Sequence, residues 1–363
     1  MVHPMTPYVK IDVQKVKQNV NRMVTTLRKH NINHRPHVKT HKIVELAKLE
    51  VESGAIGISC ATLTELEVMA KNGIKNILLA YPLIGEEQCE KLCDILSTYD
   101  FEFTTIVDSE TGISGLANIG KRLNRPIKVY VDIDSGGHRE GIQSSEVIPF
   151  VKKVVKNKWL HFTGLFTYFG HIYQFDKTDH PRKTSEEANI LIKHNDLLEK
   201  EGIKVEHLSG GSTVSSHYPE QLAGLTESRA GNFIFYDMNA VHLGIVNPEN
   251  CALRVVAQVV SKPLPGKATI DAGSKALTTD DPLKGDAYGY VITNHSLKII
   301  NLNEEHGYVV YNPEETKVEI GDLVEIIPNH ACVVTNLANQ VFFYEGDQLL
   351  KAIEVDARGM HYW

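Results

Sequence analysis

A segment near the start of the chain carries a lysine in a position that could support chemistry. It reads His-Arg-Pro-His-Val-Lys-Thr-His-Lys over residues 34–42, and its lysine is Lys39. Pro36 disfavours a helical conformation for the residue before it, and from Ile43 onward apolar residues recur at helical spacing. Lys39 is therefore predicted to lie where a strand passes into a helix. In a barrel of alternating strands and helices, side chains at such junctions reach the substrate, so Lys39 could be a catalytic amine; the alternative is a solvated surface charge.

Two more polar segments follow predicted strands. A glycine-rich segment with Asp134 and Arg139 follows the apolar run 127–133, and the loop Ser-Gly-Gly-Ser-Thr, residues 209–213, follows the run 205–208. Phosphate groups are bound by clustered backbone amides and small hydroxyls, which glycines expose best. Ser212 and Thr213 are therefore candidate phosphate ligands. The alternative for both segments is an ordinary turn, with Arg139 in solvent.

A histidine and a cysteine close to the C-terminus could share a metal ion. His330 and Cys332 are two residues apart, so on a strand they would point the same way while Ala331 faces away. Imidazole and thiolate suit zinc, and only two protein ligands would leave positions for water or substrate, as in catalytic sites. The alternative is a buried cysteine beside a loop histidine. The histidines of residues 34–42 could also be read as a metal cluster, but their spacing matches no common zinc pattern.

The first two thirds of the chain must supply the elements that position these residues. A helix is predicted over Val13–Arg28, and a further helix over Thr62–Asn72. Eight strands with intervening helices predict a (β/α)8 barrel over residues 13–249, an α/β fold. The predicted strands are Asn33–Val38, Ile56–Cys60, Ile77–Tyr81, Phe103–Val107, Ile127–Ile133, Leu160–Thr167, Val205–Leu208 and Phe233–Tyr236.

After about Asn250 the pattern changes to strands separated by turns, with no strong helix between them. These strands are Leu253–Ser261, Lys267–Asp271, Val309–Tyr311, Val318–Glu319, Leu323–Ile327, Val341–Tyr344 and Gln348–Val355. They predict a second, β-rich domain over residues 250–363. A short strand at Thr6–Ile11 suggests that residues 1–12 join this domain.

Composition excludes several classes of function. The net charge of −7 at pH 7 gives no basic footprint for nucleic acid, and no apolar stretch approaches the ~18 residues that a membrane span needs. The N-terminus lacks the apolar core of a signal peptide. Five cysteines without a CxxC pair argue against a disulfide framework, so we expect a cytoplasmic protein.

Three motifs together resemble one enzyme family. They are Arg-Pro-His-Val-Lys-Thr-His-Lys at 35–42, the segment from Leu225 to Asp237 with Gly-Asn-Phe-Ile-Phe-Tyr-Asp at its end, and His-Ala-Cys at 330–332. All three are similar to segments of the D-serine dehydratase and D-threonine aldolase family, which belongs to the alanine-racemase-like, fold-type III class of pyridoxal phosphate enzymes. This resemblance covers nearly the whole chain. It implies a barrel with a C-terminal β domain, in agreement with the periodicity.

The resemblance assigns roles residue by residue. It makes Lys39 the lysine that carries pyridoxal 5'-phosphate, and it places Arg139 at the phenolic oxygen of the cofactor. The stretch 164–173 matches with a cofactor-contacting tyrosine at Tyr173, but Phe166 stands where a second tyrosine is usual. Tyr168 replaces a histidine there and could supply the missing hydroxyl. The remaining matches are the phosphate positions Thr213, Gly231 and Asn232, to which the loop itself adds Ser212, and the zinc ligands His330 and Cys332.

The resemblance implies a zinc-dependent lyase that acts on D-3-hydroxy amino acids. Dehydration of D-serine is favoured, because Cys332 stands where the aldolases more often have an aspartate; the alternative is cleavage of D-threonine to glycine and acetaldehyde. An amino-acid racemase, a non-catalytic pyridoxal phosphate-binding protein and a metal-dependent hydrolase are rival hypotheses. Family members typically pack the β domain against a partner barrel, so a homodimer with composite active sites is also expected.

Overall fold

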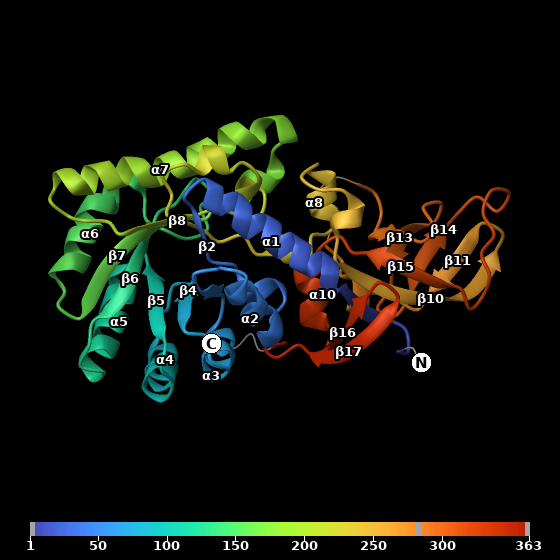
Figure 1. Cartoon of the computed structure of the whole chain (residues 1–363), viewed down its shortest axis with the longest axis horizontal. Coiled ribbons are helices and arrows are strands. Elements are labelled where there is room, and N and C mark those ends of the chain that lie inside the picture. Colours follow the sequence, from blue (N-terminus) through green and yellow to red (C-terminus); the bar gives the residue numbers. More distant parts are fainter. Residues whose placement is uncertain (1–3, 281–282, 284, 360–363) are drawn as a thin grey trace. The chain divides into compact units, whose positions relative to one another are not determined.

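The computed structural model describes residues 4–280, 283 and 285–359, and the chain falls into two compact units (Figure 1). The barrel unit contains residues 22–39 and 43–231. The β-rich unit contains the described residues 4–21, 40–42 and 232–359. The chain therefore passes back and forth between the units, and the short segment Thr40–Lys42 belongs to the β-rich unit although Lys39 belongs to the barrel unit.

The described part of the barrel unit is built on an eight-stranded parallel sheet. The two edges of this sheet meet through an isolated parallel bridge between His37 and Ser59 and a 2.8 Å hydrogen bond from Ser59 N to Pro36 O, which close the curled sheet. In spatial order the strands are β2 (Asn33–His34), β9 (Glu227–Ser228), β8 (His207–Gly210), β7 (Leu160–Phe166), β6 (Ile127–Asp132), β5 (Glu102–Val107), β4 (Asn76–Leu79) and β3 (Ile58–Cys60).

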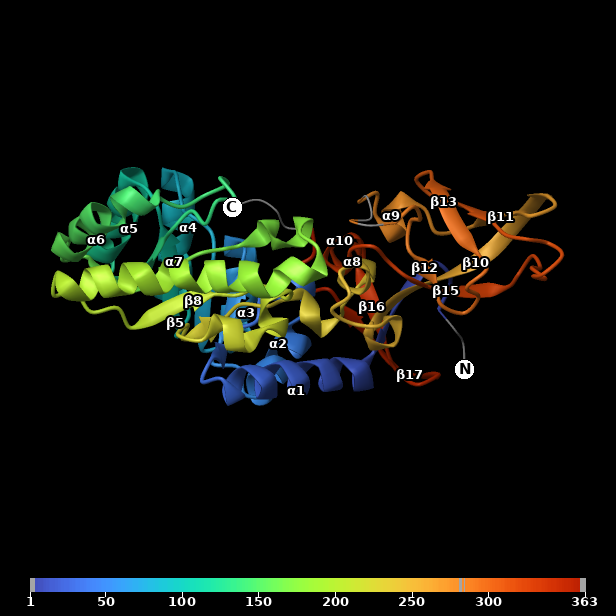
Figure 2. The ribbon, with the colours of Figure 1, turned by 90° about the horizontal axis from the view of Figure 1, so that it is seen from above.

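Helices connect most of these strands and cover the outside of the sheet (Figures 1 and 2). Local sequence explains their limits: Thr62 Oγ1 caps the start of α3 by accepting a hydrogen bond from Glu65 N at 3.1 Å, and the Glu65 carboxylate accepts another from Ala61 N at 2.7 Å. Gly73, at φ 90°, ends this helix. The helices are α2 (Val44–Glu52), α3 (Leu63–Lys71), α4 (Glu86–Thr98), α5 (Glu110–Arg122), α6 (Val147–Lys156) and α7 (His180–Lys200).

One layer of large side chains is packed together on four neighbouring strands of the sheet. Leu78, Ile106, Tyr130 and Phe166 come from β4, β5, β6 and β7, and all are buried. Tyr168 follows Phe166 by two residues and packs against this layer. Because the strands are parallel, residues beyond their carboxyl ends gather at one rim of the barrel.

The β-rich unit is a mixed sheet. Strand β1 (Tyr8–Asp12) lies between β10 (Leu253–Leu264), which is antiparallel to it, and β16 (Gln340–Glu345), which is parallel. The other strands are β11 (Lys267–Ile270), β12 (Tyr290–Val291), β13 (Lys298–Leu302), β14 (Gly307–Val310), β15 (Leu323–Ile327) and β17 (Gln348–Glu354), and the helices are α8 (Met238–His242), α9 (Ser274–Leu277) and α10 (Ala331–Leu337). Helix α1 (Val13–Lys29) has its first part in the β-rich unit and its second part in the barrel unit.

The architecture confirms the predicted fold class but corrects some elements. The run Phe233–Tyr236 is not the eighth strand: residues Asn232–Ile234 form the 3-10 turn η7 in the β-rich unit, and the eighth strand is the short polar β9. Residues 318–319 form no strand, and α9 and α10 lie where no helix was expected. Among the described residues, no helix is both long and apolar enough to cross a membrane.

Candidate active site

Lys39 lies at the rim of the barrel, in the 3-10 turn η1 (Val38–Thr40) between β2 and α2. The segment before it is fixed to the neighbouring strand: Arg35 N donates to Ser228 O at 2.9 Å, and His37 N donates to Ala230 O at 3.4 Å. The lysine side chain is exposed, and its Nζ lies 5.7 Å from the centroid of the Tyr168 ring. The backbone is therefore held firmly while the amine remains accessible to a ligand.

Arg139 lies against the same ring. Its Cζ is 4.7 Å from the centroid of Tyr168, within the range of a cation–π interaction. The loop that carries Arg139 is organised by Asp134, which accepts hydrogen bonds from Gly136 N at 2.9 Å and His138 N at 3.0 Å. Burial raises the pKa of Asp134, but these hydrogen bonds outweigh burial and lower the pKa to about 2. Tyr168 thus connects two of the predicted cofactor residues.

Hydrogen bonds to two side chains hold the backbone of the glycine-serine loop after β8. Gly211 N donates to Glu187 Oε1 at 2.7 Å, and Ser212 N donates to Ser215 Oγ at 2.7 Å. Gly211 has φ 77°, and a Cβ on it would lie 2.3 Å from Ser228 Oγ, so no other residue fits. Both Ser212 and Thr213 are buried. Burial also raises the pKa of Glu187, a residue of α7 that sequence reasoning missed.

The other predicted cofactor residues lie in different surroundings. Tyr173 is partly buried in the 3-10 turn η3 (Gly170–Gln174) after β7. Gly231 is the residue at which the chain leaves the barrel unit, and Asn232 belongs to the β-rich unit. The amide of Asn232 donates to Asp237 Oδ2 at 2.7 Å and to Cys332 Sγ at 3.8 Å. Its side chain is therefore engaged with the predicted metal ligand.

His330 and Cys332 come together, although not on a strand as expected. Strand β15 ends at Ile327, His330 is the extended residue before α10, and Cys332 is in the first turn of that helix. Asp237 fixes this turn by accepting a hydrogen bond from Ala331 N at 2.9 Å. Cys332 Sγ lies 3.3 Å from Thr40 Oγ1, and Thr40 directly follows Lys39 in the chain.

The electrostatics of this pair suit a metal. Burial raises the pKa of the Cys332 thiol, but its hydrogen bonds with His330 and Thr40 and the charge of His330 outweigh burial and lower the pKa. Burial lowers the pKa of His330, whereas Cys332, Asp237 and Asp280 raise it, with a net value of about 10. Zinc accepts a thiolate and a neutral imidazole, so binding of zinc would displace the proton that the raised pKa keeps on His330. The described residues contain no group of three or more histidine, cysteine or carboxylate side chains that could hold a metal ion together.

The rim of the barrel suits a phosphorylated aromatic cofactor. An exposed lysine amine stands beside an aromatic ring, and two strands away in the sheet order a loop that only glycine can form carries small hydroxyl side chains. The amides of Gly211 and Ser212 in this loop donate to Glu187 and Ser215 within the protein. The amine and the hydroxyls are groups that pyridoxal phosphate requires: an amine for a covalent link and clustered small donors for a phosphate.

Arg229 is a buried cation that sequence reasoning did not single out. Its Nη1 donates to Ser209 Oγ at 2.6 Å and its Nη2 to Thr167 O at 2.5 Å, and its Cζ lies 3.6 Å from the Phe166 ring centroid. Burial lowers its pKa to about 10. The only sequence feature that could have pointed to Arg229 was its place in the segment 225–237, which resembles the family.

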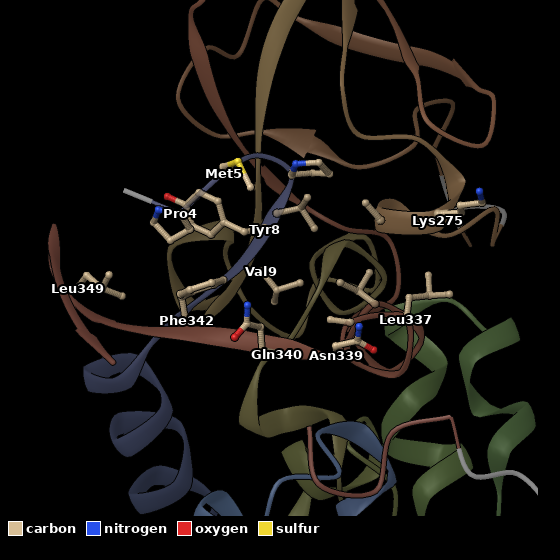
Figure 3. Close-up of a pocket in the computed structure, with 15 residues that line it drawn as sticks. Pro4, Met5, Tyr8, Val9, Lys275, Leu337, Asn339, Gln340, Phe342 and Leu349 are labelled. Atoms are coloured by element: carbon tan, nitrogen blue, oxygen red, sulfur yellow. The ribbon is translucent and has the colours of Figure 1, made fainter. Parts of the chain in front are cut away.

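A separate pocket of about 590 Å³ lies in the β-rich unit (Figure 3). Tyr8, Val9, Leu337 and Phe342 give it an apolar lining, and its charged residue, Lys275, is paired with Glu305. The pocket lacks a cluster of titratable groups and is therefore a poor candidate for catalysis.

Comparison with known proteins identifies the family. Residues 11–238 match the family model "Alanine racemase, N-terminal domain", and residues 252–344 match "Putative serine dehydratase domain". The chain is 26% identical to 3-hydroxy-D-aspartate aldolase of Paracoccus denitrificans (strain Pd 1222), covering 98% of this chain and 93% of the relative. It is 28% identical to D-serine dehydratase of Dictyostelium discoideum, covering 94% of each.

A solved relative agrees along the whole fold. D-threo-3-hydroxyaspartate dehydratase from Delftia sp. HT23 has a TM-score of 0.90 and 25% identity and covers 99% of this chain and 98% of its own. A cysteine-to-alanine mutant of that enzyme has been solved in the metal-free form. The resemblance predicted from the sequence motifs is thus confirmed, and the chain belongs to the alanine racemase-like family, in its group of D-serine dehydratase and D-threonine aldolase type pyridoxal phosphate lyases.

Proposed function

We propose that this protein dehydrates D-serine to pyruvate and ammonia with the help of pyridoxal phosphate and zinc. The observation that carries the proposal is that the candidate lysine is directly followed in the chain by a residue that contacts the candidate metal-binding thiol. Lys39 stands at the rim of the barrel, and the next residue, Thr40, contacts the low-pKa thiol of Cys332. An amine and a metal-binding thiolate are the two groups that elimination from a β-hydroxy amino acid requires.

The cofactor would be held by residues of this chain in three ways. Lys39 would carry it covalently, Arg139 and Tyr173 would contact its ring, and the phosphate would bind Ser212, Thr213, Gly231 and Asn232. When bound, pyridoxal phosphate withdraws electrons from the substrate α-carbon. The substrate amine would first displace Lys39 from the cofactor, and the freed Lys39 Nζ would then take the proton from that carbon. The Tyr168 ring, at 5.7 Å from Nζ, would help to orient the resulting ammonium form.

His330 and Cys332 would hold zinc. A bound zinc ion acts as a Lewis acid on the substrate hydroxyl, which is otherwise a poor leaving group. Asn232 would orient the thiolate, because its amide already donates to Cys332 Sγ. Asp237 would keep the first turn of α10 in place through its hydrogen bond to Ala331 N.

The same residues could cleave D-threonine, and this is the second candidate function. The relatives include a protein named D-threonine aldolase, from Arthrobacter sp, at 24% identity. Cys332 favours dehydration, whereas Phe166 and Tyr168 depart from the dehydratase pattern and weaken that preference. Dehydration breaks the bond between the β-carbon and its hydroxyl oxygen, whereas aldol cleavage breaks the bond between the α- and β-carbons. The products therefore distinguish the two reactions.

The decisive experiment is incubation of the protein with D-serine, D-threonine and their L-forms. We expect ammonia from D-serine, little glycine from D-threonine, and no turnover of either L-form. Treatment with a chelator should abolish turnover while the visible absorbance of the bound cofactor persists, and zinc should restore turnover. Full turnover of D-serine by metal-free enzyme would disprove the metal role. Glycine and acetaldehyde from D-threonine, without ammonia from D-serine, would favour the aldolase.

We also propose that the protein is a cytoplasmic homodimer with composite active sites. Thr40 joins Lys39 to the contact with Cys332 within one chain, so the lysine and the metal ligands of one site belong to the same protomer, and the partner would supply other residues. Sedimentation at several protein concentrations, combined with activity assays at the same concentrations, tests the proposal. We expect a dimer, with activity that is lost when dilution separates the protomers; a monomer with full activity would disprove it.

A further inference from the structure

We propose that Asp280 is the positioning residue that fixes metal ligand His330 in the tautomer and orientation needed for coordination. This inference rests on the metal site of the proposed function. Asp280 Oδ2 lies 2.6 Å from His330 Nδ1, and both residues belong to the β-rich unit. An Nδ1–H that donates to a carboxylate leaves Nε2 with its lone pair as the nitrogen for a metal, and an anionic acceptor makes that nitrogen more basic.

The carboxylate of Asp280 is itself oriented by its surroundings. Thr278 Oγ1 donates to Asp280 Oδ1 at 3.2 Å, and Asp280 N donates back to Thr278 Oγ1 at 3.1 Å. The other carboxylate oxygen, Oδ2, is thereby directed to His330. Hydrogen bonds therefore connect Thr278 to Asp280 and Asp280 to His330, the proposed metal ligand.

The backbone at Thr278 is strained, so this geometry is maintained against an unfavourable conformation. Thr278 is buried and has φ 71°, a left-handed conformation that β-branched residues rarely adopt. Asn329, the residue before His330, also binds the segment that carries Asp280. Its Nδ2 donates to Asp280 O at 3.4 Å, and its Oδ1 accepts a hydrogen bond from Gly289 N at 3.1 Å. Strain held in place beside a candidate ligand is typical of a functional site.

The alternative role for Asp280 is direct coordination of the metal. In the structure, Oδ2 is engaged by His330 and Oδ1 by Thr278, so both oxygens already have partners. The two roles differ in what an amide can replace. Asparagine can accept the Nδ1–H bond through its own oxygen and preserve the tautomer, but it is a poor substitute for a carboxylate ligand to zinc.

The test measures the zinc dissociation constant of metal-free protein by competition with a chromophoric chelator, without any activity assay. Variants Asp280→Ala and Asp280→Asn are compared with Asp286→Asn. Asp286 is an exposed aspartate nearby in sequence whose carboxylate pairs with Lys298 instead of His330, so it controls for loss of one negative charge. We expect Asp280→Ala to weaken zinc binding about 10–100-fold, Asp280→Asn to stay within about threefold of wild type, and Asp286→Asn to have no effect.

The outcomes separate this inference from the proposed function. A wild-type protein that binds no zinc, or binds it equally well as Cys332→Ser, would overturn both the metal site and the role of Asp280. Tight wild-type binding that Asp280→Ala leaves within twofold would overturn the positioning role alone. Equal losses in Asp280→Asn and Asp280→Ala would show that the carboxylate itself acts on the metal. Melting curves of the metal-free variants verify that each one is folded, and the asparagine variant provides the result if the alanine variant is not.

Discussion

Substitution of Glu227 by glutamine should destabilise the barrel by several kcal/mol. Glu227 Oε2 lies 2.9 Å from Arg35 Nε, and the side chains are 0% and 5% exposed, respectively. Burial raises the pKa of Glu227, but the charge of Arg35 and a hydrogen bond from Ser209 outweigh burial and lower it. The glutamine would leave the Arg35 guanidinium buried without a counter-charge. Breaking one partner of a buried ion pair costs about 3–5 kcal/mol.

The pair joins the candidate lysine segment, through Arg35, to the neighbouring strand β9, through Glu227, so the loss should be visible as a lower melting temperature. For a domain of this size, each kcal/mol shifts the midpoint by roughly 2–4 °C, which gives a decrease of about 6–20 °C. Circular dichroism melting of wild type and Glu227→Gln measures it. The double variant Arg35→Met/Glu227→Leu should recover much of the loss, because it removes both charges at similar volume.

The pH dependence of this difference has a defined sign. Because the pKa of Glu227 is lower in the folded protein, the pair contributes its full stability above the unfolded-state pKa of about 4.3 and loses it as the pH falls through the lower folded value. The gap between wild type and Glu227→Gln should therefore be constant near neutral pH and should shrink in acid. A change below about 1 kcal/mol at pH 7, or a double variant no better than the single one, would refute the reasoning.

Three further predictions concern the cofactor. Lys39→Ala should lose the visible absorbance of the bound cofactor and its trapping by borohydride while keeping wild-type circular dichroism; trapping that persists would move the covalent link elsewhere. Gly211→Ala should weaken cofactor binding at least tenfold because its Cβ would meet Ser228 Oγ at 2.3 Å, whereas Gly202→Ala, at similar positive φ but with nothing within 4 Å, should bind normally. Tyr168→Phe should retain cofactor binding because the aromatic ring remains, and it should lower turnover because the hydroxyl that replaces the missing tyrosine is lost. Unchanged turnover would exclude a role of this hydroxyl in catalysis.

Strands with apolar runs could be predicted from sequence because burial on both faces leaves a continuous signal. The run that became β6, Ile127–Asp132, is the clearest example. Strand β9 gave no such signal, since its residues Glu227 and Ser228 are polar and become buried only through partners such as Arg35. The apolar run Phe233–Tyr236 was misread for the converse reason: its side chains are buried in a turn of the other unit.

The candidate site was predictable where the chemistry lies in a local motif. Lys39, His330 and Cys332 each stand in a short segment with a recognisable pattern. Asp280 could not be found this way, because its hydrogen bond to His330 spans fifty residues of sequence. Glu187 and Arg229 have the same character: one lies on a helix and the other on a strand end, and only the fold brings them to the glycine-serine loop and to Phe166.

The position of β1 between β10 and β16 also sets an order of events during synthesis. The barrel strands from β2 to β9 have all left the ribosome once Ser228 has emerged, so the barrel sheet can close early. Strand β1 is made first of all, yet its parallel neighbour β16 begins only at Gln340. Because roughly 330 residues separate the two strands and synthesis adds about 5–20 residues per second, the nascent chain carries β1, with Val9 and Ile11 of the later core, for tens of seconds before its parallel partner exists. A chain that ends before β16 would keep that edge open permanently and would be prone to associate with other chains.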